Sequence, residues 1–171
     1  MSARTLGIIE LKGEDTDGAA LLESSLAPLM VQCAEQMIEL RVVSDVDVPH
    51  IDVDREKIAW AISVIVGNAL RYLKRGTEDQ VGGSVLVHLT AQAGGSEVAI
   101  AVQDDGPGMS KEKLSLLFER GPGEAHAPAL ALSLVTDIAR AHGGRVTLDS
   151  RNGREEHYTC VTLVLPSAGR K

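Results

Sequence analysis

Aromatic side chains are scarce in this sequence, whose 171 residues include one Trp, two Tyr and one Phe. The core must therefore be aliphatic, and any ring near a pocket becomes a candidate ligand contact. Cysteine is scarce too, since Cys33 and Cys160 lie far apart and outside any Cys-x-x-Cys or Cys/His cluster. This spacing indicates neither a disulfide framework nor a cysteine-based metal site.

Long apolar runs and an excess of positive charge are also missing. No run approaches the roughly 18 residues that a membrane span needs, and no signal peptide opens the chain, so we expect a cytoplasmic domain without membrane contact. The formal net charge of −7 argues against nucleic acid as the main partner, because phosphate binding needs a basic face. The length and the hydrophobic content of 44% are typical of one globular domain spanning residues 1–171.

What the sequence does contain is an alternating apolar run, residues 98–102, that leads directly into Asp104-Asp105-Gly106-Pro107-Gly108. The alternation predicts a half-buried strand that ends in this turn. An Asp-x-Gly-x-Gly turn places a carboxylate beside backbone without side chains, where a flat ligand can approach closely. The alternative is an ordinary surface turn, because Asp, Gly and Pro are common turn residues.

Periodicity predicts three main helices, over about 19–37, 55–74 and 129–141. Asp17 and Asp54 are expected to cap the first two, and Pro28 is expected to kink or divide the first. Strands are predicted over 6–11, 38–43, 84–92, 96–103, 145–150 and 157–165. The minor elements are a polar turn over 13–18, a short helix over 111–117 capped by Ser110, and a mobile loop over 121–128. This order predicts an α+β two-layer sandwich, with one mixed, mostly antiparallel sheet and the helices on one face.

Asn68 lies on the flank of the apolar stripe of the helix over 55–74, between Val64 one turn before and Tyr72 one turn after. An amide in such a place either has a buried hydrogen-bond partner or faces a ligand. The residues alone leave both alternatives open.

Four motifs follow one another in a characteristic order: Asn68 on a long helix, Asp-x-Gly-x-Gly after a strand, Leu-Phe-Glu-Arg, and a helix that ends in Ala-His-Gly-Gly before a hairpin. This arrangement resembles the catalytic ATP-binding domain of bacterial sensor histidine kinases, a family in the wider group of gyrase, Hsp90 and MutL. The resemblance covers about residues 20–166. It implies a histidine kinase ATPase-like fold and an enzyme of two-component signalling that uses ATP, yields ADP and needs Mg²⁺.

The resemblance also implies roles for single residues. Asn68 would be the catalytic residue that ligates Mg²⁺ held by the phosphates, since an amide oxygen suits a hard cation. Asp104 would accept a hydrogen bond from the adenine amino group. The other implied nucleotide contacts are Arg71 to phosphate, Tyr72 near the nucleotide, Gly106 and Gly108 leaving room for the base, Met109 against the base, Phe118 at the start of a lid, and Leu130 and Leu132 in a second glycine box.

This chain departs from the family pattern at four positions. Ala127, Ala129 and Ala131 stand where the second glycine box has glycine, so we expect the γ-phosphate to be held loosely. Val64 stands where the gyrase group has its catalytic Glu, which argues against a gyrase-type hydrolase.

The acceptor of the phosphoryl group is a further open question. None of the five histidines is followed by Asp or Glu, and no pair of long amphipathic helices precedes Asp17. The resemblance therefore implies that the acceptor histidine lies on a dimerising helical hairpin, either in a removed N-terminal segment or on another protein. His142 is interpreted instead as a helix C-terminal residue favoured by the helix dipole.

The implied partners are this hairpin, a homodimer formed through it, and a downstream response regulator. Two other functions compete with the histidine kinase hypothesis. One is a nucleotide-binding pseudokinase or scaffold module, suggested by the three alanines and Val64. The other is an anti-sigma-type serine kinase, which the Ala-His-Gly-Gly hairpin pattern disfavours.

Overall fold

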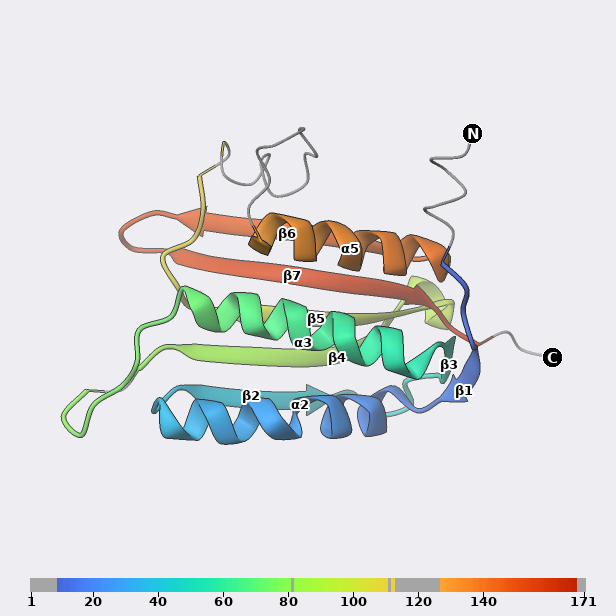
Figure 1. Cartoon of the computed structure of the whole chain (residues 1–171), viewed down its shortest axis with the longest axis horizontal. Helices are drawn as coiled ribbons and strands as arrows, with labels where there is room; N and C mark the ends of the chain where they lie inside the picture. Colours follow the sequence, from blue (N-terminus) through green and yellow to red (C-terminus); the bar gives the residue numbers. More distant parts are fainter. Residues whose placement is uncertain (1–8, 81, 111, 113–126, 169–171) are drawn as a thin grey trace.

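The computed structural model of the chain describes residues 9–80, 82–110, 112 and 127–168. Figure 1 shows these residues as one layer of helices on one layer of sheet. The sheet has five strands in the order β2-β4-β5-β7-β6. Its strands are β2 (Glu39–Ser44), β4 (Ser84–Gln92), β5 (Glu97–Asp104), β6 (Arg145–Asn152) and β7 (His157–Pro166). Only β2 and β4 pair in parallel, so the expected mixed, mostly antiparallel sheet is confirmed.

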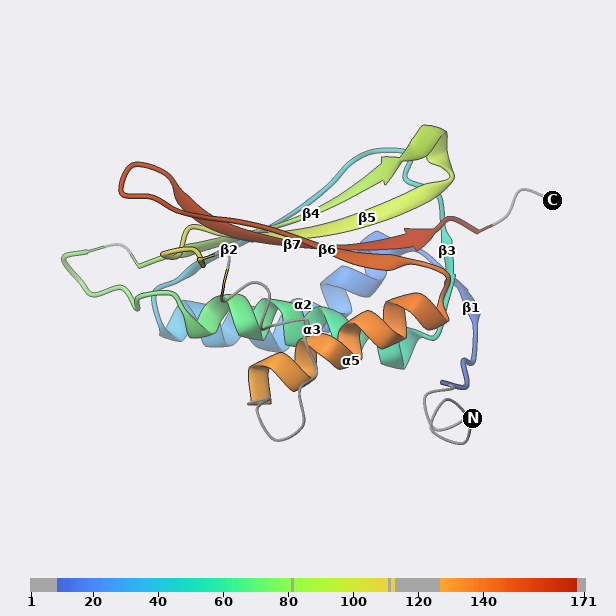
Figure 2. The same ribbon diagram turned by 90° about the horizontal axis from the view of Figure 1, so that it is seen from above.

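Three main helices cover one face of the sheet, and no α-helix of the described residues lies on the other face (Figure 2). They are α2 (Gly18–Glu35), α3 (Arg55–Arg71) and α5 (Ala127–Ala141). The carboxylates of Asp17 and Asp54 accept the backbone N–H groups of Ala19 and Lys57 at 3.0 and 3.2 Å, as predicted for N-caps. The helix α2 is not divided at Pro28, which lies inside it.

The core is aliphatic, as the shortage of aromatic residues predicts. Its largest fully buried side chains include Leu22, Leu26, Ile51, Ile58, Ile62, Ile65, Leu89, Ile100, Leu132, Leu163 and Leu165. Two of the aromatic residues, Trp60 and Tyr72, lie at the surface with 42% and 43% of their area exposed. No described helix is long and apolar enough to cross a membrane.

The structure differs from the sequence-based prediction near the N-terminus. Residues 9–11 of the expected strand over 6–11 are in no strand, and residues 6–8 lie outside the described part. The first strand is β1 (Glu14–Thr16), in the segment expected to be a turn, and it pairs antiparallel with β3 (Ile51–Val53). Strands of three residues are too short to carry a readable alternation of apolar and polar side chains.

Two expected elements fall largely outside the described residues. Of the helix over 111–117, the structure describes only Glu112, which is helical. Residues 121–126 of the expected loop are not described, while Ala127 and Pro128 belong to α5 and not to a loop. Proline is tolerated there because the first turn of a helix does not need its N–H. The strands β4 and β5 are joined, as expected for a hairpin, by a 3-10 turn, η1 (Ala93–Gly95).

The C-terminal end of α5 is tied to the start of α3 through His142. Its Nδ1 donates to the carbonyl of Ile138 at 2.8 Å, and its Nε2 accepts the backbone N–H of Asp54 at 3.1 Å. The imidazole must therefore be neutral to accept, so hydrogen bonds rather than a charge on the helix dipole explain this residue. Gly144 follows, and a Cβ on it would overlap the carbonyl of Val164.

We predict that Gly144→Ala destabilises the fold by at least about 1–3 kcal/mol, because backbone on β7 must move to admit the methyl group. Gly67→Ala is the matched control, since Gly67 is in α3 and a Cβ added there would have no neighbouring atom within 4 Å. That variant should gain about 0.5–1 kcal/mol from helix propensity. Urea unfolding of both variants measures the difference, and equal stabilities would contradict the close packing of Gly144.

Candidate functional site

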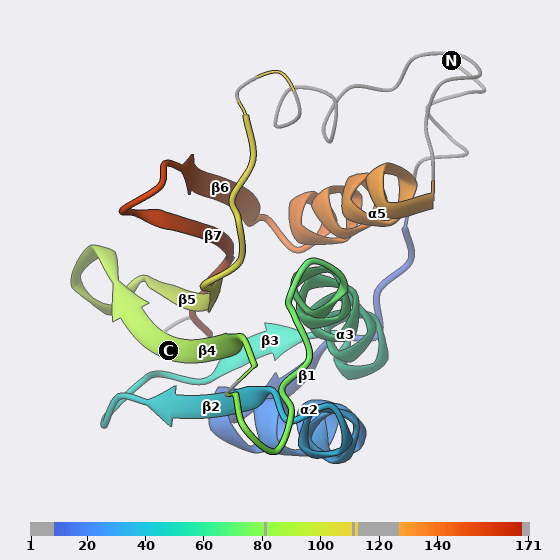
Figure 3. The same cartoon turned by 90° about the vertical axis from the view of Figure 1, so that its left-hand side faces the viewer.

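The candidate site lies where α3 and β5 both end, beside the hairpin that joins β6 to β7. Figure 3 looks at this end of the molecule. The C-terminal end of α3 lies against the turn after β5. The closeness is shown by Gly106, where an added Cβ would be 3.7 Å from the carbonyl oxygen of Tyr72 and 3.4 Å from a methyl group of Leu73. The fold thus brings together the helical and the glycine-rich motifs, which are distant from each other in the chain.

Asp104 is a buried carboxyl group, with 5% of its area exposed. Its Oδ1 accepts the backbone N–H of Gly106 at 2.9 Å. The pKa of Asp104 is raised from its ordinary value of 3.8 to about 6, mainly by burial and also by the nearby charge of Asp105, while hydrogen bonds from the backbone N–H groups of Gly106 and Thr159 lower it. A carboxylate has more acceptor positions than two N–H groups fill, so Asp104 can accept a further hydrogen bond from a ligand.

Asp105 faces away and has a different task. Its two carboxylate oxygens accept the backbone N–H and the hydroxyl of Ser84 at 2.8 and 3.0 Å, at the exposed start of β4. The expected contrast between a buried Asp104 and an exposed Asp105 is therefore confirmed. The contact of Asp104 with adenine stays a prediction.

Asn68 is buried in α3, with 8% of its area exposed, yet its amide makes no hydrogen bond to another described residue. Within the described part of the chain, no fully buried side-chain nitrogen or oxygen lacks a partner. The polar atoms of Asn68 must therefore reach solvent, which favours the ligand-facing alternative. Its amide oxygen is the kind of ligand that suits a hard divalent cation.

Metal binding by side chains alone is not indicated in this site. Among residues 9–80, 82–110, 112 and 127–168, no group of three His, Cys, Asp or Glu side chains could hold a metal ion. A cation at Asn68 would therefore need most of its ligands from a bound molecule and from water, which is how Mg²⁺ is commonly held.

The two glycines of the turn differ in what they make room for. A Cβ on Gly106 would lie 2.8 Å from Oδ1 of Asp104, so this glycine lets the carboxylate approach the turn. Gly108 has a φ of 76°, and a Cβ on it would overlap the carbonyl of Arg151 on β6. Its absent side chain therefore serves packing of the turn against the sheet edge, a requirement that sequence reasoning missed.

Met109 and Leu132 form one small apolar cluster next to this turn. The backbone N–H of Met109 donates to Oγ of Ser150 at 2.9 Å, which fixes the segment after Gly108. Leu132 is fully buried, with Met109 and Leu148 packed against it. The position of Leu132 is thus behind Met109, where it supports that side chain.

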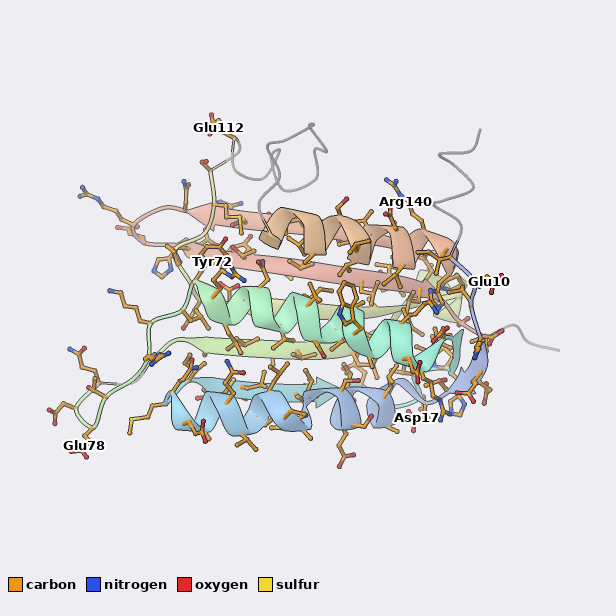
Figure 4. All side chains as sticks on the ribbon, viewed as in Figure 1. Glu10, Asp17, Tyr72, Glu78, Glu112 and Arg140 are labelled. Atoms are coloured by element: carbon orange, nitrogen blue, oxygen red, sulfur yellow. The ribbon has the colours of Figure 1, made fainter. Side chains whose placement is uncertain are left out.

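The remaining expected contacts are only partly described. Arg71 is exposed at the end of α3, and Figure 4 shows Tyr72 at the same end, 43% exposed. Phe118 and the side chain of Leu130 lie outside the described part. The helix α5 begins at Ala127, and no alanine in it has a positive φ, so Ala129 and Ala131 fit the helical backbone that they adopt.

Sequence reasoning missed His157, the first residue of β7. Its Nδ1 lies 2.7 Å from the carbonyl oxygen of Gly106 and 3.1 Å from that of Asp105. The contact with Gly106 joins residues 51 positions apart, and no local pattern around His157 indicated it. The same histidine lines a cavity of about 540 Å³ with Tyr72 and Pro107, which is large enough for a small molecule.

Comparison with known proteins identifies one family. The model of the family described as histidine kinase-, DNA gyrase B- and HSP90-like ATPase matches residues 53–169. The histidine protein kinase DivJ of Caulobacter vibrioides is 30% identical over 163 residues, which cover 92% of this chain and 26% of DivJ. The adaptive-response sensory kinase SasA of Crocosphaera subtropica is 33% identical over 135 residues, covering 74% of this chain and 32% of SasA. The chain thus spans about a quarter to a third of these relatives.

Solved structures share the fold. Full-length ShkA in complex with AMPPNP has a TM-score of 0.77 at 21% identity, over 95% of this chain and 33% of ShkA. The mycobacterial sensor histidine kinase MprB has a TM-score of 0.72 at 22% identity, over 92% of this chain and 99% of the MprB chain. The expected α+β sandwich is confirmed by these neighbours.

We predict that Asp104→Asn stabilises the ligand-free protein in a pH-dependent way. The folded state binds the Asp104 proton more tightly than the unfolded state, so the wild type loses stability as the pH rises from about 4 to 6, by about 3 kcal/mol for the raised pKa. The variant cannot ionise there and keeps that stability. Its advantage in unfolding free energy should therefore be larger at pH 7.5 than at pH 4.

The matched control is Asp105→Asn, at the neighbouring carboxylate that is exposed to water. Because burial is the main cause of the raised pKa of Asp104 and the charge of Asp105 a lesser one, this variant should show a much smaller gain with rising pH than Asp104→Asn. Denaturant unfolding at both pH values measures these free energies. An Asp104→Asn gain of equal size at pH 4 and 7.5 would disprove that burial raises the pKa of Asp104.

Proposed function

The chain belongs to the histidine kinase-, DNA gyrase B- and HSP90-like ATPase family, and we propose that it is the ATP-binding catalytic domain of a two-component sensor histidine kinase. The observation that carries this proposal is the buried carboxylate of Asp104 beside a glycine turn, at the same end of the fold as the amide of Asn68. The relatives DivJ and SasA are named as kinases, which supports the same conclusion.

Base recognition is the first task in this proposal. Asp104 accepts a hydrogen bond from the exocyclic amino group of adenine, and Gly106 keeps the approach to that carboxylate clear. Met109, supported from behind by Leu132, provides an apolar surface for the ring. A buried carboxylate can only accept, so it favours a base with an amino donor and disfavours one with a carbonyl at that position.

Phosphate binding is the second task. Asn68 holds Mg²⁺ through its amide oxygen, and Arg71 at the end of α3 faces the phosphates. The bound ion supplies charge neutralisation for the triphosphate. The first turn of a helix such as α5 has N–H groups without partners inside the helix, and such groups attract anions even with alanine in place of glycine.

Transfer is the third task, and it needs a second domain. A nitrogen of the acceptor histidine forms a bond to the γ-phosphorus, the bond from this phosphorus to the bridging oxygen breaks, and ADP leaves. The acceptor lies on a histidine-bearing dimerisation domain, which makes the whole kinase a homodimer in the cytoplasm. A response regulator then receives the phosphoryl group, and the structure of ThkA in complex with the response regulator TrrA shows such a partnership for a protein of this fold.

Val64 and the alanines at 127, 129 and 131 favour a second candidate, a nucleotide-binding pseudokinase or scaffold. The discriminating experiment mixes the domain with its natural helical hairpin and labelled ATP. Acid-labile, base-stable phosphate on the hairpin histidine supports the kinase. Nucleotide binding without any transfer supports the scaffold, and absence of nucleotide binding refutes both.

We predict that Asp104→Ala weakens ADP binding about tenfold to a hundredfold, because a lost hydrogen bond to a charged group costs about 1.5–3 kcal/mol. Asp105→Ala should change the affinity little, since Asp105 bonds Ser84. Isothermal titration calorimetry with ADP measures both. Equal losses would show that the base-reading carboxylate is assigned one residue out of register.

We also predict that Asn68→Ala weakens ADP binding in the presence of Mg²⁺ and changes it much less in EDTA. The reason is that the amide acts on the nucleotide through the ion. Titration of the variant and the wild type under both conditions tests this, with thermal unfolding as the check on folding. An equal loss with and without Mg²⁺ would assign Asn68 to direct nucleotide contact instead.

A further inference from the structure

We propose that His157 is a positioning residue for base recognition, which holds the Gly106 carbonyl and thereby aims the carboxylate of Asp104. This inference rests on the proposed function, because it names a further residue of the same nucleotide site. It assigns a role to a side chain on the last strand, far in sequence from the Asp-x-Gly-x-Gly turn that it contacts.

The two backbone groups of Gly106 are both engaged. Its N–H donates to Oδ1 of Asp104 at 2.9 Å, and its carbonyl oxygen lies 2.7 Å from Nδ1 of His157. Gly106 has no side chain to fix its orientation, so these two backbone contacts hold this residue. The N–H belongs to the Asp105–Gly106 peptide, whose carbonyl lies 3.1 Å from the same Nδ1, and the Gly106 carbonyl belongs to the next peptide, so loss of the imidazole frees both peptides that flank Gly106.

The contacts of Gly106 with Asp104 and His157 link the end of β5 to the start of β7, two strands that also pair in the sheet. Asp104 is paired with Thr159 in the ladder between β5 and β7, and His157 lies two residues before Thr159 on the same strand. The backbone of Asp104 is therefore held by β7 directly, and its carboxylate is held both by the backbone N–H of Thr159 and, through Gly106, by His157. One strand thus sets both the position and the direction of the carboxylate.

The contact with a carbonyl oxygen determines which imidazole nitrogen of His157 carries a proton. A carbonyl oxygen can only accept, so Nδ1 of His157 carries a proton and donates it, whether the ring is neutral or charged. The opposite nitrogen, Nε2, has no hydrogen bond to another described residue. His157 is therefore a donor that orients the turn, with no proton transfer required of it.

Another histidine of the sheet offers a matched control. Nε2 of His88, in the middle of β4, lies 2.8 Å from Oδ1 of Asp45, so its loss removes an exposed imidazole contact away from the turn. His157→Leu removes the donor at the site, and His157→Asn restores one, since the side-chain amide nitrogen of Asn can replace Nδ1.

The experiment measures binding of ADP and of adenosine to the wild type and the three variants by NMR titration, with thermal unfolding of each. We expect His157→Leu to weaken both ligands by the same factor, about threefold to tenfold for one neutral hydrogen bond. His157→Asn should stay within about twofold of the wild type, on the same basis of a conserved donor. His88→Leu should bind both ligands like the wild type.

Several results would overturn the inference. Wild-type binding by His157→Leu shows that Gly106 needs no anchor, and a loss for ADP alone assigns His157 to the phosphates. Equal losses in the Leu and Asn variants show that the ring packs and does not donate. A wild type that binds neither ligand refutes the proposed function itself, whereas the other outcomes refute only the role of His157.

Discussion

The candidate site depends on one constraint, a carboxylate that is buried without a cation. None of the ion pairs among the described residues includes Asp104, and its Oδ1 accepts instead from the backbone of Gly106. Glycine at 106 lets the carboxylate approach the turn, because a Cβ there would lie 2.8 Å from its Oδ1. The turn must then be fixed by its neighbours on β6 and β7, since it cannot fix itself. The arrangement costs the ligand-free fold stability, and a ligand that donates to Asp104 offsets this cost.

Much of this site could be predicted because its signals are local in the sequence. The helix bearing Asn68 and the strand that leads into Asp104 each show a clear apolar period, and periodicity depends only on near neighbours. Alternation along the strand also predicted that Asp104 and Asp105 differ in burial. The sheet and the helix layer followed from the order of these elements, with errors of a few residues at their ends.

The rest could not be predicted because it depends on contacts between distant segments. Gly108 packs against Arg151 and His157 holds Gly106, and neither contact leaves a pattern around either partner. The burial of Leu132 behind Met109 depends on how α5 crosses the sheet, which no single segment determines. The ends of helices are hard to predict for the same reason. The helix α5 begins at Ala127, where the sequence shows no helical periodicity.

The placement of Trp60 has a practical consequence for spectroscopy. It is the one tryptophan of the chain, and it lies on the outer surface of α3, about two turns before Asn68 and 42% exposed. The intrinsic emission of the protein therefore comes from a single, partly hydrated indole that is outside the core. A blue shift of this emission would report that another surface has covered the helix layer, independently of whether nucleotide occupies the far end of the same helix.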